Sequence, residues 1–141
     1  MWDELRDPNT TPERLRELAT SACDVWRLWV ARHPNTPADV LMVMLDDTDG
    51  CVPWNLAQNP AARPELIDEL VSRRLFLEVV AANKSAPPRV LAQLAREPVI
   101  YVRTAAALNP STLGAALALL AADADAEVRK NVARTATRPN P

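Results

Sequence analysis

One short motif returns at a fixed interval along this chain of 141 residues. Pro8-Asn9-Thr10 recurs 26 residues later, from position 8 to position 34, as Pro34-Asn35-Thr36. In the same register, an aliphatic residue follows the start of each unit by seven positions: Leu15, Leu41, Ile67, Leu91 and Leu117. An alanine recurs near the end of each unit: Ala31, Ala57, Ala81, Ala107 and Ala133. A period of this length is typical of stacked repeats, in which each unit buries its apolar face only against its neighbours.

Each unit holds two apolar clusters with helical spacing. In the first, Leu15, Leu18 and Ala19 stand at i, i+3 and i+4, which predicts a helix that we call helix A. The second cluster, such as residues 128–133, is shorter and predicts helix B. The chain has 13 prolines and 2 glycines, and prolines fit helices only at their starts and in the loops between them. The composition therefore predicts many short helices.

The repeat predicts an all-α fold, an α-solenoid of five two-helix repeats in a single domain, residues 1–141. The repeats are expected at about residues 7–33, 34–59, 60–83, 84–109 and 110–135, followed by a disordered tail, residues 136–141. In the second repeat, Thr36-Pro37-Ala38-Asp39 predicts a helix start with Thr36 as the N-cap and Pro37 as the first helical residue.

Two segments resemble one known family. They are the start of the second unit, residues 34–41, which reads Pro-Asn-Thr-Pro-Ala-Asp-Val-Leu, and the end of the fifth, residues 128–133, which reads Val-Arg-Lys-Asn-Val-Ala. Both are similar to the leucine-rich repeat variant family, a bacterial α-solenoid related in shape to armadillo and HEAT repeats. The resemblance extends over about residues 7–135. It implies a right-handed superhelix with some short or 3₁₀ helices, in which the B helices line the concave surface.

Composition and single residues argue against several functions. The net charge of −2 disfavours nucleic acid as a partner, because phosphate binding needs an excess of Lys and Arg. Cys23 and Cys51 are too few for a disulfide framework and indicate a cytoplasmic protein. His33, the only histidine, stands at a turn position, so we expect neither an enzyme nor a metal site. A founding family member holds an iron–sulfur centre in cysteines ahead of its repeats; no cysteine stands there here, so no cofactor is expected.

Departures from the repeat supply the candidate binding residues. Trp29 and Trp54 stand in helix-B positions that hold mixed residues elsewhere, so they form either an aromatic binding patch or filling near the N-terminal end. Arginine recurs four positions before the alanine, at Arg27, Arg103 and Arg129. These arginines either pair with acids of the A–B loops or form a basic ladder for an acidic partner.

Apolar residues also replace polar ones on the outer side of two A helices. Met42 and Val43 do so in the second repeat, and Ala118 and Leu119 in the fifth. Either the superhelix curls over these residues, or they form an interface with a partner or a second copy, which we expect for the fifth repeat. The third repeat is shorter by two residues and carries Ser72-Arg73-Arg74 in its A–B loop, which either kinks the superhelix or forms a small basic spot.

The sequence thus predicts a non-enzymatic scaffold that binds a protein partner through its concave helix-B face. The alternative is a homo-oligomeric structural protein that associates through the fifth repeat. A solenoid that binds nucleic acid is the third hypothesis, favoured by the arginine column and opposed by the net acidity. No stretch is long and apolar enough for a membrane span, so a membrane partner is not expected.

Overall fold

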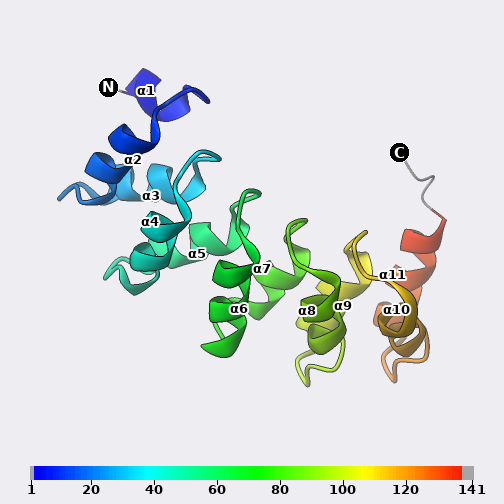
Figure 1. Cartoon of the computed structure of the whole chain (residues 1–141). Coiled ribbons are helices and arrows are strands. Elements are labelled where there is room, and N and C mark those ends of the chain that lie inside the picture. The colour runs from blue at the N-terminus through cyan, green and yellow to red at the C-terminus, as the bar shows by residue number, and fades with distance from the viewer. Residues whose placement is uncertain (1, 138–141) are drawn as a thin grey trace. The chain divides into compact units, whose positions relative to one another are not determined.

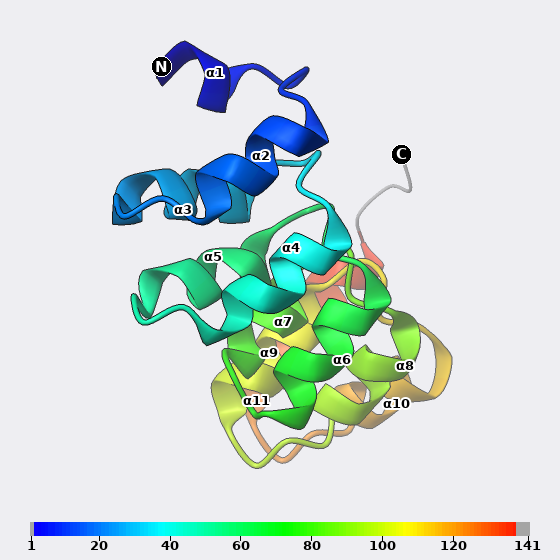
Figure 2. The ribbon, with the colours of Figure 1, turned by 60° about the vertical axis from the view of Figure 1, so that its left-hand side comes forward.

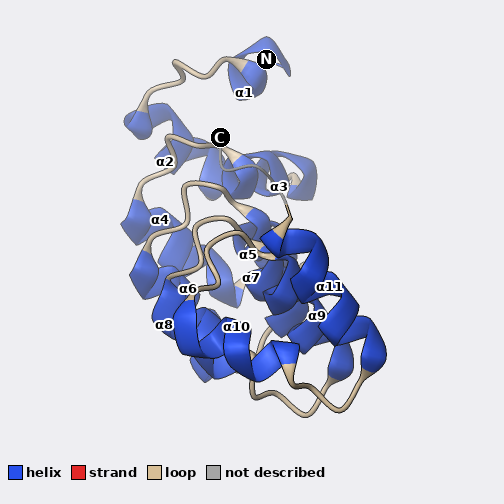
Figure 3. Cartoon of the chain, turned by 90° about the vertical axis from the view of Figure 1, so that its right-hand side faces the viewer, coloured by secondary structure: helices blue, strands red, loops and turns tan. Residues whose placement is uncertain are grey.

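The computed structural model describes residues 2–137, in which every regular element is a helix (Figure 1; Figure 3). In chain order the elements are α1 (Trp2–Arg6), α2 (Pro12–Ala19), α3 (Asp24–Arg32), α4 (Ala38–Val43), the 3₁₀ helix η1 (Met44–Asp46), α5 (Cys51–Gln58), α6 (Pro64–Ser72), α7 (Leu77–Ala82), α8 (Pro88–Leu94), α9 (Ile100–Leu108), α10 (Gly114–Ala121) and α11 (Ala126–Ala136). The all-α solenoid class is confirmed, including short and 3₁₀ helices, and the right-handed superhelix stays a prediction. Within residues 2–137, no helix has both the length and the apolar character that crossing a membrane requires.

Helices of the A and B types alternate along the chain. The A helices are α2, α4 with η1, α6, α8 and α10, and the B helices are α3, α5, α7, α9 and α11. The last of these, α11, continues to Ala136, and residues 138–141 of the expected disordered tail lie outside the described residues.

The chain divides into two compact units, residues 1–67 and 68–141, with the boundary inside α6. In the first unit, α3 packs against α1, α2 and α5 (Figure 2). In the second unit, α9 packs against α7 and α11, and α10 packs against α8 and α11. Neighbouring repeats within each unit therefore stack through their B helices, as expected for a solenoid.

Threonine side chains tie the end of one helix to the start of the next A helix in three of the repeats; Ala62 and Ala86 hold the equivalent positions in the other two. Thr36 Oγ1 donates a hydrogen bond to the Val30 carbonyl at 2.6 Å, and Thr112 Oγ1 donates to the Ala106 carbonyl at 2.6 Å. The predicted N-cap at Thr36 is therefore wrong: α4 begins at Ala38, because the Thr36 hydroxyl is used by the preceding B helix. Thr10 makes the same contact, six residues back, with the carbonyl of Glu4 in α1. Hence α1 takes the place of a B helix ahead of the first repeat.

The aliphatic columns of the repeat form the core. Leu15, Leu41, Ile67 and Leu91 are at most 2% exposed, and Ala31, Ala57, Ala81 and Ala107 are fully buried. The last repeat differs, since Leu117 is half-buried and Ala133 is exposed. These two columns are therefore less buried in the last repeat than in the others, whereas Leu120 and Val128 of the same repeat are fully buried.

Asparagines at the end of the B helices join successive repeats. Asn109 Nδ2 donates to the Ala81 and Asn83 carbonyls at 2.7 and 2.9 Å, and its Oδ1 accepts from the Ser111 backbone N–H at 2.9 Å. Asn59 Nδ2 makes the matching pair of bonds in the first unit, to the carbonyls of Ala31 and His33. Both asparagines are buried. Because a buried carbonyl without a partner is costly, this column sets the spacing between repeats.

Candidate functional site

The arginine column was one candidate for partner binding, and Arg27 is its first member. Its Nε and Nη2 atoms bind the two carboxylate oxygens of Asp47 in the next repeat at 2.7 and 3.1 Å. Nη1 donates to the Ser21 carbonyl in the A–B loop of its own repeat at 2.8 Å. Only 9% of the Asp47 side chain is exposed, and the hydrogen bonds from Arg27 lower the pKa of this carboxyl group. Asp47 therefore stays ionised and holds two repeats together.

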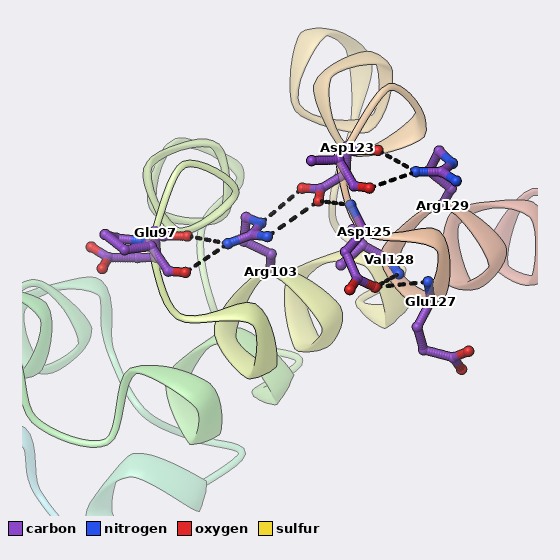
Figure 4. Close-up of polar contacts among 9 residues, drawn as sticks. Glu97, Arg103, Asp123, Asp125, Glu127, Val128 and Arg129 are labelled. Carbon is purple, nitrogen blue, oxygen red and sulfur yellow. Dashed lines mark hydrogen bonds and ion pairs between the residues drawn. The ribbon is translucent and has the colours of Figure 1, made fainter.

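Arg103 repeats this arrangement in the second unit (Figure 4). Its Nε and Nη2 atoms bind the Asp123 carboxylate at 2.8 and 3.2 Å, and Nη1 donates to the Glu97 carbonyl at 2.8 Å. Arg129 Nη1 donates to the carbonyls of Asp123 and Ala124 at 2.6 and 3.0 Å. All three arginines thus close their own A–B loops, and two of them also bind a carboxylate of the following repeat.

Arg74 takes the role of the column arginine in the third repeat, a role that the sequence did not predict. The third repeat has Leu77 at the arginine position, 20 residues before Glu97, yet the Glu97 carboxylate is bound by Arg74 at 2.8 Å. Arg74 has a φ of 55° and follows α6, where Leu75 N–H bonds to the Leu70 carbonyl at 2.8 Å. This conformation favours glycine and costs another residue about 1–2 kcal/mol. The shortened loop therefore places a guanidinium where the repeat lacks one, and it accounts for Ser72-Arg73-Arg74 better than a free basic spot does.

The two candidate tryptophans lie on neighbouring B helices of the first unit but have different surroundings. Trp54 in α5 is 42% exposed, and Val25 in α3 is 40% exposed. Trp29 in α3 is half-buried, and the guanidinium carbons of Arg6 and Arg32 lie 5.6 and 5.9 Å from its ring centroid. Trp54 thus presents an aromatic side chain to solvent, whereas the Trp29 ring has two cations within 6 Å of its centroid.

A pocket of about 310 Å³ opens beside Trp29. Its lining is Arg6, Pro8, Trp29, Arg32, His33 and Pro34. His33 is buried and committed to backbone: Nδ1 accepts the Asn35 N–H at 3.1 Å, so Nε2 carries the proton and donates to the Asp7 carbonyl at 2.9 Å. Arg6 and Arg32 were not among the predicted site residues, although their 26-residue spacing, from 6 to 32, matches the repeat.

The part of the chain that contains this pocket is similar to a known family. Residues 1–45 match the family model described as Leucine Rich Repeat Variant domain. This segment is similar to the leucine-rich repeat variant family. No curated protein and no solved structure matches the chain. The resemblance predicted from the repeat pattern is therefore confirmed over residues 1–45, a segment that includes α1 as well as the first complete repeat.

The matched segment, residues 1–45, also carries the first pair of candidate interface residues. In α4, Val43 is 76% exposed and Met42 is half-buried. The second pair lies in the other unit, in α10, where Leu119 is 39% exposed and Ala118 is exposed. Leu113, directly before α10, is 62% exposed and adds to the apolar surface of this helix.

Proposed function

We propose that this protein is a non-enzymatic scaffold that binds a protein partner through the helix-B face of its first unit. The observation that carries the proposal is the exposure of Trp54, 42% of whose surface is open to solvent on α5, beside α3 with its exposed Val25. Large exposed aromatic side chains are enriched among the residues that dominate binding energy. Repeat proteins of this kind offer extended surfaces to partners, which agrees with the family match.

Several contacts support a binding role over catalysis. Both ring nitrogens of His33, the only histidine, are engaged by backbone groups, which leaves it unsuited to act as a general base. The thiols of Cys23 and Cys51 are free and exposed, which fits a reducing cytoplasm. Arg27 and Arg103 are bound to internal carboxylates, so they are poorly placed to form a ladder for phosphates.

Replacing Trp54 tests the proposed face. Trp54→Ala is expected to raise the Kd for a partner purified by affinity capture by about 30-fold or more, because a buried interface tryptophan typically contributes at least 2 kcal/mol. Isothermal titration calorimetry with the purified partner measures the change. Tyr101→Ala is the matched control, since Tyr101 is also aromatic and is 67% exposed but lies on α9 in the second unit. Equal affinity of wild type and Trp54→Ala would refute the assignment of this face.

Helix α10 favours a second candidate, a homo-oligomer joined through the fifth repeat. The helix carries no charged residue, and Leu113 and Leu119 are 62% and 39% exposed. Large exposed apolar side chains on a helix without charges are a feature of surfaces that become covered on association. In this second candidate function, the surface of α10 binds a second copy of the chain.

Light scattering decides between one copy and two. If the fifth repeat is the interface, the wild type has twice the monomer mass, and Leu119→Glu is monomeric, because a carboxylate is strongly disfavoured in an apolar interface. Leu108→Glu is the control, since Leu108 has a similar exposure of 37% but lies on the B helix α9. A monomeric wild type, or a dimer that Leu119→Glu leaves intact, rules out this alternative.

A further inference from the structure

The pocket over Trp29 is lined by two copies of the same repeat positions. Arg6 and Arg32 are equivalent residues one period apart, and so are Pro8 and Pro34. In the following repeats the arginine position holds Gln58, Ala82, Leu108 and Arg134. The N-terminal end of the first unit is therefore where successive repeats both supply a guanidinium.

The charges of Arg6 and Arg32 are not neutralised within the protein. Among residues 2–137, neither arginine forms an ion pair, whereas Arg14, Arg16 and Arg27 in the same unit are bound to carboxylates. Both guanidiniums lie within 6 Å of one indole ring, so two like charges share one small site. An anion in the pocket that both arginines line would be attracted by both charges. A guanidinium that lies over a ring also keeps N–H groups at its edge, which match the two oxygens of a carboxylate.

We propose that this pocket binds the carboxylate of an acidic side chain from a peptide segment of the partner, with the guanidiniums of Arg6 and Arg32 on its oxygens and Trp29 against its aliphatic carbons. The proposal rests on the proposed function, since the pocket lies on α3, whose neighbour α5 carries Trp54. It adds the chemistry that the partner must offer, a glutamate or aspartate beside the residues that cover Trp54.

Size and charge favour a peptide carboxylate over a nucleic acid. A volume of about 310 Å³ holds one side chain with its backbone, and its walls of tryptophan and proline suit the methylene groups of such a side chain. His33 does not contribute a further donor to the ligand, because its Nε2 proton is used by the Asp7 carbonyl. Two cations on a chain of net charge −2 neutralise one or two anionic groups, whereas a nucleic acid needs a longer row of phosphate contacts.

Binding is measured by titrating ¹⁵N-labelled full-length protein with N-acetylglutamate α-amide, whose single carboxylate is on the side chain. We expect a saturable shift of the Trp29 indole N–H signal, assigned with Trp29→Phe. N-acetylglutamine α-amide, which is neutral, is expected to bind about tenfold more weakly or not at all, because charge-assisted hydrogen bonds are lost. The proposal is overturned if the signal does not shift to saturation at ligand concentrations that would fill a site with a millimolar Kd. Equal shifts with both amides overturn it too. Tighter binding of inorganic phosphate or of an oligothymidylate than of the glutamate amide overturns it as well.

Variants test the two arginines separately. Arg6→Ala and Arg32→Ala are each expected to weaken glutamate-amide binding by about tenfold, with Arg32→Lys between wild type and alanine because lysine keeps the charge but not the planar pair of donors. Arg134→Ala is the matched control, since Arg134 holds the same repeat position in the second unit and should leave the affinity unchanged. Circular dichroism checks that each variant is folded. If Trp54→Ala loses partner binding while both arginine variants keep their affinity for the glutamate amide, the pocket proposal is rejected and the proposed function stands. If Trp54→Ala keeps partner binding while the arginine variants lose affinity for the glutamate amide, the proposed function is rejected and the pocket proposal stands.

Discussion

Asn109→Ala is expected to lower the free energy of unfolding by about 2–4 kcal/mol, since it removes three hydrogen bonds and leaves two carbonyls without their donor. The Asn109 side chain is buried, and its amide nitrogen lies 2.7 and 2.9 Å from the carbonyl oxygens of Ala81 and Asn83 in the preceding repeat. Water cannot replace these bonds without opening the interface between repeats. The change is measured by urea denaturation followed by circular dichroism.

Two further substitutions at this position separate donor loss from side-chain loss. Asn109→Asp keeps the shape but puts one carboxylate oxygen in place of the amide nitrogen, against two carbonyl oxygens, so it is expected to be at least as damaging as alanine near neutral pH. Asn109→Thr should be milder, because Thr135 occupies the equivalent position in the last repeat and donates from Oγ1 to the Ala107 carbonyl at 2.9 Å. Similar stabilities for wild type and Asn109→Asp would show that the amide donor is not what joins the repeats.

Much of the fold was predictable because a repeat sequence places an apolar residue at the same core position in every unit. Leu15, Leu41, Ile67 and Leu91 occupy one such position, and all four are buried as their period indicates. Leu117 breaks the rule although its local sequence fits the column, since its burial depends on a neighbouring repeat and not on its own helix. End effects of this kind are invisible to a periodicity argument.

The candidate site was less predictable, because its contacts join segments that the repeat does not align. Trp29 was singled out by its column, but its cation partners are not: Arg6 lies in α1, ahead of the first repeat that the motif discloses. The contact of Arg74 with Glu97 was equally hard to predict, because non-glycine residues rarely adopt a positive φ and no loop sequence indicates that one will. In both cases the sequence singled out the residue, and only the path of the backbone showed which side chain it contacts.

Leu91→Ala is expected to cost about 2–5 kcal/mol of unfolding free energy, the range for removing a leucine from a closed core. Leu91 is fully buried on α8, inside the second unit. Leu117→Ala changes the same column position on α10, but Leu117 is half-buried, so less apolar surface returns to water and the space left is open to solvent. Its cost should be no more than about half that of Leu91→Ala. Urea denaturation and calorimetry on both variants measure this difference, and equal losses would mean that the core does not depend on stacking between neighbouring repeats.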